Sequence, residues 1–322
     1  MKLRLIITAI LITPLIGLSQ QKDTLINKLD SLSKKQDSAG GQINNISLNA
    51  YDEDTKITFN AYFALLGSDL KQEFTKPFHM TRKNWGNFAE MLAVGGALSF
   101  ADKPIQRNAA PLITKYQGLG KVSSFITKFG GPYEAFALGT FGAYGIIFKS
   151  QKMKTTTLLA TQAYLTGAAL ESVMKYLSGR TRPVYYEGTG QEPRPRFFGP
   201  FSKTSKTVNG KKLYSSFPSG HTTVAFAAAT VFALEYSNQP WTPILAYSAA
   251  TMIGLSRITE NKHWATDVFA GALIGFMAGK NVVNNYHRYA KLKAPGKRNN
   301  KPVSFNLQYF NGHITPGLTY RF

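Results

Sequence analysis

Apolar and small residues dominate six segments between residues 88 and 283, and polar loops that contain glycine or proline separate them. None of the six segments alternates strictly between apolar and polar residues, as a half-buried strand does. The pattern therefore predicts an all-α fold with a six-helix bundle core, in which frequent alanine and glycine let the helices approach closely. The predicted helices are Phe88–Ala101, Tyr133–Phe148, Thr155–Leu177, His221–Glu235, Trp241–Leu255 and Thr266–Val283.

The lengths of the uncharged runs bear on whether these helices cross a membrane. A span needs about 20 apolar residues, whereas runs of about 10–14 are more typical of buried core helices. The uncharged run Thr155–Leu170 falls short of a span, and the longer run Tyr236–Ser256 contains Pro240 and Pro243. Mean hydropathy is −0.16. The sequence favours a compact exported domain, and an integral membrane core is the alternative.

The N-terminus differs from this core. Lys2 and Arg4 precede the mostly apolar run Ile6–Leu18, and small residues follow it. This pattern predicts a secretory signal peptide over residues 1–19, with an uncleaved anchor helix as the alternative. Residues 20–84 are then expected to form a polar helix, a glycine-containing linker and a collar of helix or turns.

The C-terminus changes character again after residue 286. Arg288–Lys301 contains six basic residues and no acidic one, which predicts a solvated basic linker, with a lipid-surface contact as the alternative. Alternation over Val303–Tyr309 and Leu318–Phe322, around turn residues, predicts a short C-terminal β-hairpin. The hairpin is expected to pack on the bundle, and a terminal strand of the outer-membrane kind is the alternative.

Composition narrows the classes of function. The chain has no cysteine, which excludes a disulfide framework, cysteine-ligated metals and a cysteine nucleophile. Its net charge of +21 favours anionic partners. Because an exported protein rarely meets nucleic acid, we expect phosphorylated substrates and a membrane surface as partners, and no nucleic acid.

The first constellation with chemical potential is Lys175, followed after six residues by Arg182 and Pro183. Lys175 lies near the end of a predicted helix for which Gly179 is a plausible stop. Arg182 lies in an extended turn imposed by Pro183. An ammonium and a guanidinium can thus point at one place, although basic residues near a helix C-terminus also simply complement the dipole.

The second constellation, Pro218-Ser219-Gly220-His221, opens the next predicted helix. Ser219 can cap the helix, and Gly220 removes a side chain where the backbone must approach a ligand. The free N–H groups of a helix start form an anion site, and His221 at its mouth is placed to move a proton. An ordinary capped helix is the alternative.

The third constellation is Ser256-Arg257, then His263, then Asp267. On a helix, residues four apart share a face, so Asp267 can hold one imidazole nitrogen of His263 as N–H and leave the other free to attack. A helix salt bridge is the alternative. Together the three constellations suit a highly charged oxyanion, with cations in the role that Mg²⁺ plays elsewhere, so we expect no metal and no cofactor.

These three motifs resemble those of the type 2 phosphatidic acid phosphatase superfamily, which also includes non-specific acid phosphatases and vanadium haloperoxidases. The family pattern is Lys-x6-Arg-Pro, Pro-Ser-Gly-His and Ser-Arg-x5-His-x3-Asp, and the chain matches it without departure over about Trp85–Tyr286. The resemblance implies that His263 is the nucleophile and forms a phosphohistidine, that Asp267 orients it, and that His221 protonates the leaving alkoxide and then activates water. The phosphate-binding residues that it implies are Lys175, Arg182, Ser219, Gly220 and Arg257.

We therefore expect an exported phosphatase that hydrolyses phosphomonoesters or diphosphates, of lipids in particular, in the periplasm or on a cell-envelope membrane. The aromatic, basic loop Val184–Phe217 suits a lipid phosphate, or else packs on itself. Six full spans after an exported N-terminus would leave the motifs in the cytoplasm, so we expect a core that does not fully span. The alternatives are a vanadate-dependent haloperoxidase and a non-catalytic envelope protein with a vestigial site.

Overall fold

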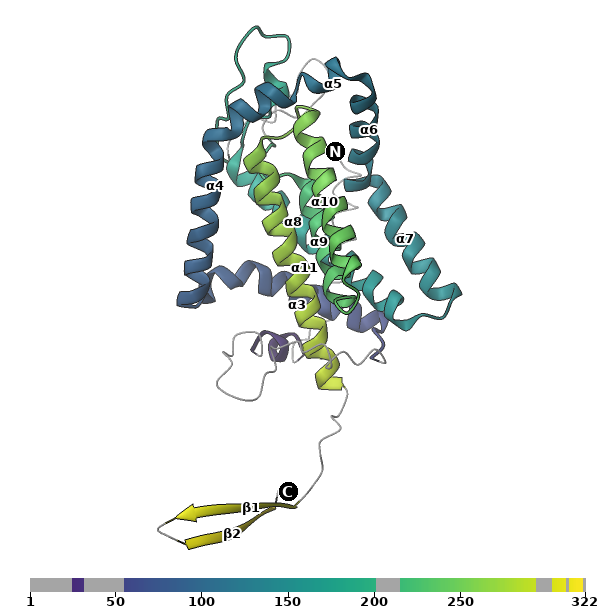
Figure 1. Cartoon of the computed structure of the whole chain (residues 1–322), viewed down its shortest axis with the longest axis vertical. Helices are drawn as coiled ribbons and strands as arrows, with labels where there is room; N and C mark the ends of the chain where they lie inside the picture. The colour runs from purple at the N-terminus through teal and green to yellow at the C-terminus, as the bar shows by residue number, and fades with distance from the viewer. Residues whose placement is uncertain (1–24, 32–54, 201–214, 294–302, 311–312, 321–322) are drawn as a thin grey trace, which may run out of the picture.

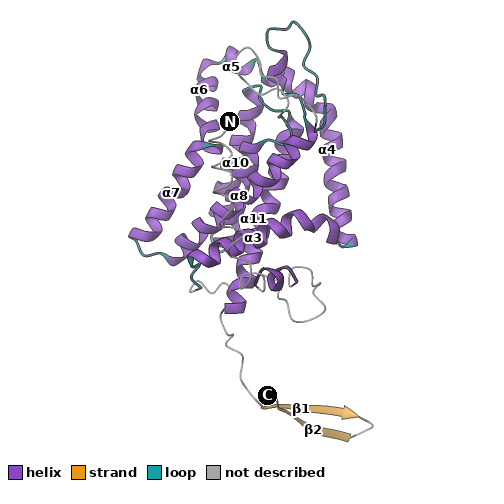
Figure 2. Cartoon of the chain, turned by 180° about the vertical axis from the view of Figure 1, so that it is seen from behind, coloured by secondary structure: helices purple, strands orange, loops and turns teal. Residues whose placement is uncertain are grey.

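The computed structural model describes residues 25–31, 55–200, 215–293, 303–310 and 313–320. Apart from two C-terminal strands, its regular elements are helices, as the hydrophobic pattern predicts (Figures 1 and 2). The predicted signal peptide lies outside the described residues. The α-helices are α3 (Phe59–Thr75), α4 (Arg82–Ala109), α5 (Leu112–Lys115), α6 (Gln117–Thr127), α7 (Pro132–Ile147), α8 (Gln151–Ser178), α9 (Gly220–Glu235), α10 (Trp241–Thr259) and α11 (Ala265–Lys293), and three short 3₁₀ helices are η2 (Lys76–His79), η3 (Lys128–Gly130) and η4 (Pro183–Tyr186).

Each of the six predicted segments corresponds to one helix, namely α4 and α7 to α11. The ends agree less well, because α4, α8 and α11 run beyond the predicted segments. The described residues also contain a short helix over residues 25–31, α3, α5 and α6, so the six segments do not account for every helix. In the predicted collar, the structure has α3 and η2.

Local capping explains where several helices begin and end. The side chains of Thr58, Thr81 and Ser150 accept hydrogen bonds from the backbone N–H three residues later, at the starts of α3, α4 and α8. These bonds satisfy N–H groups that have no partner within a helix. At the other end of α8, Gly179 has a left-handed φ of 52°, the backbone conformation that favours glycine at a helix C-terminus. The sequence-based stop at Gly179 is confirmed.

Helices α9 and α11 pack most closely through glycines spaced four residues apart on α11. A Cβ atom on Gly271 would lie 2.6 Å from the carbonyl oxygen of Ser219, and one on Gly279 would lie 2.6 Å from that of Ala227. Real side chains do not tolerate such distances, so only glycine permits this approach. The close contact fixes the start of α9 against the start of α11.

The main apolar core lies where α3, α8, α9 and α11 meet. Leu65, Leu159, Val231 and Val283 are buried there. The predicted basic linker is wrong over its first residues, because α11 continues to Lys293 and Arg288 is buried. This end of α11 packs against α3, which explains why it is a buried helix and not a solvated linker.

The C-terminal strands β1 (Val303–Phe310) and β2 (His313–Tyr320) pair antiparallel, with Val303 opposite Tyr320 and Phe310 opposite His313. How this pair packs stays a prediction. In the part of the chain that the structure describes, no helix combines the length and apolar content that a bilayer crossing requires.

Candidate active site

The candidate site lies at one end of the bundle, where α8 and α10 end and α9 and α11 begin (Figure 1). Two hydrogen bonds tie these ends together. The backbone N–H of Ser219 donates to the carbonyl oxygen of Asp267 at 2.9 Å, which joins α9 to α11. The hydroxyl of Ser178 donates to the carbonyl oxygen of Phe217 at 2.9 Å, which joins the end of α8 to the segment before α9.

The imidazole of His263 is buried with one nitrogen held by the backbone. Its Nδ1 lies 2.8 Å from the carbonyl oxygen of Ser216. Because a carbonyl oxygen only accepts hydrogen bonds, Nδ1 carries the proton and Nε2 keeps its lone pair. Burial, followed by the charges of Arg182 and Arg257, lowers the pKa of His263 well below its usual value. The ring is therefore neutral, and the lone pair of its Nε2 is available.

Asp267 supports this ring less directly than the spacing suggests. Its Oδ2 lies 3.5 Å from Nδ1 of His263 and instead accepts hydrogen bonds from the Ser216 hydroxyl at 2.5 Å and the Trp264 N–H at 2.9 Å. Its Oδ1 accepts from Arg180 at 2.5 Å. Burial raises the pKa of Asp267, and Arg180 opposes that rise. Asp267 is thus linked to His263 through Ser216.

Three cations surround His263 and His221. Arg182 is largely buried, donates to the carbonyl oxygen of Ser215 at 3.1 Å and forms no ion pair with any carboxylate among the described residues. Arg257 donates to Glu260 at 3.0 Å, and its Nε is buried without a partner. Lys175 pairs with Glu171, and burial lowers its pKa despite that pair. An anion site needs buried cations whose hydrogen-bond donors are still unused, and these guanidinium groups meet that condition.

The start of α9 lies beside these cations. Ser219 is buried as the residue before the helix, and its hydroxyl accepts from Thr222 at 2.9 Å. It therefore does not cap α9 by its side chain, as the sequence suggested it could. Burial, then the charge of Arg257, lowers the pKa of His221 to about 3. His221 is therefore neutral at pH 7 in this structure.

Gly220 leaves room that a side chain would fill. A Cβ atom there would overlap a carboxylate oxygen of Glu171 and lie 3.1 Å from Nζ of Lys175. We expect Gly220→Ala to displace the Lys175–Glu171 pair, raise KM for a phosphate ester about tenfold and lower the free energy of unfolding by about 1–3 kcal/mol. Steady-state kinetics and urea unfolding measure both quantities.

Gly139 provides the matched control for that substitution. It lies within α7 with open space where a Cβ atom would be. Gly139→Ala should leave KM unchanged and stabilise the helix by about 0.5–1 kcal/mol. Equal KM values for the two variants would contradict the role given to Gly220.

Four residues that the sequence analysis did not identify hold the motif residues in place: Asp102, Glu171, Arg180 and Ser216. Arg180 donates to Oδ2 of Asp102 at 2.6 Å as well as to Asp267. Asp102, on α4, accepts from the N–H and the hydroxyl of Thr266 at 2.9 and 2.6 Å. A lone carboxylate after the apolar run Met91–Ala101 was the available signal for Asp102.

Part of the aromatic loop packs on this network. The guanidinium carbon of Arg180 lies 4.9 Å from the ring centre of Phe197 and 6.0 Å from that of Phe217. Tyr186 is buried, and its hydroxyl donates to the carbonyl oxygen of Arg194 at 2.9 Å. These rings shield the network, and the residues 201–214 of the loop lie outside the described chain.

Comparisons with known proteins identify relatives of this chain. Residues 156–290 match the family model of the PAP2 superfamily. A lipid A 1-phosphatase of Porphyromonas gingivalis is 51% identical over 67 residues, which are 20% of this chain and 15% of that protein. Lipid phosphate phosphatase 1 of Arabidopsis thaliana is 31% identical over 158 residues, 42% of this chain and 48% of that protein. The chain thus spans less than half the length of these two relatives.

A lipid A 1-phosphatase of Rhizobium johnstonii is matched over more of its length, at 28% identity over 58% of this chain and 74% of that protein. Among solved structures, LpxE of Aquifex aeolicus is 26% identical with a TM-score of 0.38, over 54% of this chain and 91% of that one. The resemblance seen in the three motifs is confirmed. Residues 156–290, which match the PAP2 superfamily model, contain all three motifs.

Proposed function

We propose that the chain is a metal-independent phosphatase that removes a phosphoryl group from a phosphomonoester or diphosphate of a lipid through a phosphohistidine on His263. Nε2 of His263 attacks phosphorus and the ester oxygen leaves with a proton from His221. Water then attacks the phosphohistidine with His221 as base, and inorganic phosphate departs. His221 gains the proton it must donate when the phosphate dianion enters and offsets the nearby cations.

One observation carries this proposal: a neutral imidazole with a free Nε2 lies among buried cations, and the Nε groups of Arg182 and Arg257 have no partner among the described residues. Fixed donors around an entering phosphoryl group stabilise the charge on its equatorial oxygens, and they need no reorganisation during the reaction. Covalent catalysis divides the hydrolysis into two easier steps. We assign the oxygens to Lys175, Arg182, Arg257, the Ser219 hydroxyl and the N–H group of Gly220.

Two observations support a lipid substrate and action at a membrane surface. The first is that the relatives are named as lipid phosphatases, and the second is the exposed apolar surface of two helices. Large apolar side chains on α7 and α10 are exposed, among them Phe136, Ile147, Trp241 and Leu245, each by two thirds or more. Exposed apolar surface of this extent is typical of contact with a membrane or a partner. We propose that this face meets the lipid surface from which the substrate comes, in the cell envelope.

Phosphate release by the purified full chain in excess EDTA tests the proposal. We expect release from a long-chain lipid phosphate in detergent at the same rate with and without EDTA, because cations of the chain replace the metal. A short soluble phosphate ester serves as the second substrate. A rate that EDTA removes and Mg²⁺ restores would contradict the metal-independent mechanism. No release from either substrate by folded protein would overturn the phosphatase, and bromide oxidation with added vanadate would then be tested.

A further inference from the structure

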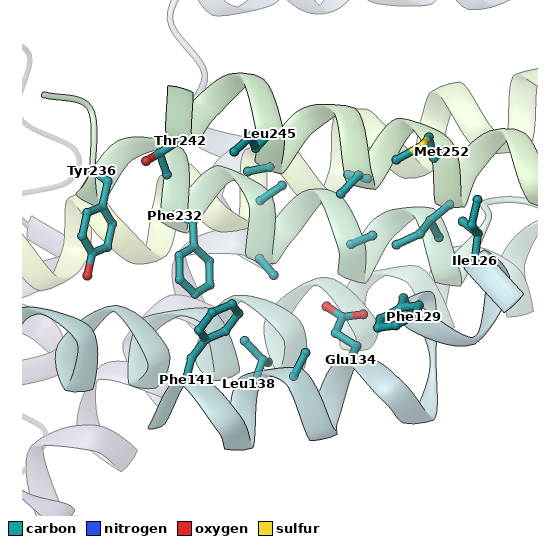
Figure 3. Close-up of a pocket in the computed structure, with 18 of the residues that line it drawn as sticks. Ile126, Phe129, Glu134, Leu138, Phe141, Phe232, Tyr236, Thr242, Leu245 and Met252 are labelled. Atoms are coloured by element: carbon teal, nitrogen blue, oxygen red, sulfur yellow. The ribbon is translucent and has the colours of Figure 1, made fainter. Parts of the chain in front are cut away.

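A groove beside the candidate site runs between α7 and α10, with α9 as its floor (Figure 3). Its volume is about 670 Å³, within the usual size range of small-molecule sites. Apolar side chains such as Leu138, Phe141, Phe232 and Met252 form most of its walls. Among the described lining residues, one side chain carries a carboxyl group, that of Glu134.

Glu134 is a buried carboxyl group without a polar partner among the described residues. Its side chain lines the groove from the first turn of α7, between Phe129 and Leu138 (Figure 3). The residue is 6% exposed, and neither carboxyl oxygen has a hydrogen-bond partner within the described chain. Burial raises the pKa of Glu134 to about 8, so the group is protonated at neutral pH. A protonated carboxyl offers one donor and one acceptor to whatever fills the groove.

The Glu134 end of the groove lies next to the reacting groups. The N–H of Glu134 donates to the carbonyl oxygen of Gly131 at 3.1 Å. A Cβ atom on Gly131 would lie 3.4 Å from Nε2 of His221. Ile253, which lines the groove, lies against Gly130. A ligand bound to the phosphate site through its head group would therefore pass Glu134 before it reaches the apolar walls.

We propose that the groove binds an acyl chain of the phosphorylated lipid and that Glu134 selects a chain with a hydroxyl or amide group close to its head-group end. This inference rests on the proposed function and adds a specificity residue to it. A buried polar group left unpaired costs free energy, and a matching group on the ligand recovers it. A plain alkyl chain would fill the walls equally well but leave Glu134 unpaired.

A neutral hydroxyl or amide on the ligand suits Glu134 better than a cationic group does. Burial alone accounts for the raised pKa of Glu134, and no nearby basic side chain holds it ionised. An ammonium group on the chain would instead require the carboxylate and would pull its pKa down. A neutral ligand group and an ammonium group can be distinguished by Glu134→Gln, because an amide can pair with the neutral group but cannot supply the negative charge that an ammonium group requires.

The test compares two lipid phosphates with the same head group and chain length, one 3-hydroxyacylated and one plain. We expect the full chain to prefer the hydroxylated lipid by about tenfold in kcat/KM. Glu134→Gln should keep most of that preference, because an amide also donates and accepts, whereas Glu134→Leu should lose it. Glu90→Gln, on the exposed face of α4, is the matched control and should keep the preference.

Dissociation constants of the corresponding non-hydrolysable phosphonates, measured by calorimetry, should show the same preference. This readout separates the two proposals, because a binding preference without phosphate release would overturn the phosphatase and support the groove. A wild-type protein without preference, or a preference that survives Glu134→Leu, would overturn the groove inference. Tighter binding of an ammonium-bearing chain, lost in Glu134→Gln, would also overturn it.

A second pair of variants tests the groove walls. Ala249 lines the groove from the exposed side of α10, and its neighbour Ser248 does not. We expect Ala249→Trp to raise KM for the long-chain lipid phosphate at least about fivefold relative to that for the short soluble ester. Ser248→Trp should leave this ratio unchanged. Equal KM ratios for the two variants would show that the acyl chain of the lipid does not bind in this groove.

Discussion

Replacement of His263 with alanine is expected to reduce kcat for phosphate release by about 10⁴-fold or more, to the limit of detection. His263 is the described side chain that offers a free imidazole nitrogen with its tautomer fixed, by the Ser216 carbonyl at 2.8 Å. The cations would still bind phosphate in the variant, so affinity for inorganic phosphate should change little. Steady-state kinetics and phosphate binding by calorimetry measure the two quantities.

A labelled intermediate gives the sharper readout of this prediction. Wild-type protein quenched during turnover of a ³²P-labelled substrate should carry acid-labile phosphate, and the His263→Ala variant should carry none. His287→Ala is the matched control, because it removes a buried imidazole from the same helix, where His287 lies 2.9 Å from Glu235. That control loses stability but keeps labelling in its folded fraction. Label on His263→Ala would contradict the assignment of the nucleophile.

The helical class of the fold could be predicted because helices depend on the local pattern of residues in the sequence. The segments around Thr155–Leu177 and His221–Glu235 lack strand alternation, and Gly179 stops α8 as its φ of 52° requires. The end of α11 could not be predicted in this way. Tyr286 and Arg288 are buried because Thr55 and α3, more than 200 residues earlier in the chain, pack there, whereas the local sequence alone predicts a basic linker.

In the candidate site, too, some residues could be predicted from the sequence and others could not. Motif residues such as Arg182 and His263 stand at spacings that the chemistry fixes, so their types and positions could be found from the sequence. Their supports depend on contacts between distant segments, because Asp102 and Thr266 are 164 residues apart. The spacing of His263 and Asp267 also suggested a direct hydrogen bond, whereas the three other donors to Asp267 leave the Ser216 carbonyl to hold the ring.

Loss of the Arg180 charge is expected to reduce kcat by about 10²-fold while KM changes by less than about threefold. Arg180 touches no reacting group in the proposed mechanism and acts through Asp267, to which it donates at 2.5 Å. In Arg180→Gln, the Asp267 carboxylate loses its buried counter-charge and with it part of the hold on Ser216 and His263. Arg180 is thus a positioning residue, and phosphate binding should survive its replacement.

The pH profile distinguishes this role from a purely structural one. Arg180 opposes the burial that raises the pKa of Asp267, so removing its charge raises that pKa further. A carboxylate is ionised above its pKa, and the acid limb of kcat should therefore move to higher pH in Arg180→Gln. Arg180→Lys restores the charge and should move the limb back toward the wild-type position.

Two further variants control for folding. Arg180→Gln leaves Asp102 and Asp267 without their shared cation, and adding Asp102→Asn removes one uncompensated charge, so the double variant should be more stable than Arg180→Gln alone. Arg107→Gln, at an exposed ion pair with Glu192, should change neither kcat nor the acid limb. If the double variant folds with wild-type kcat and an unmoved acid limb, Arg180 does not position Asp267, and the Ser216 hydroxyl bond at 2.5 Å is sufficient to hold it.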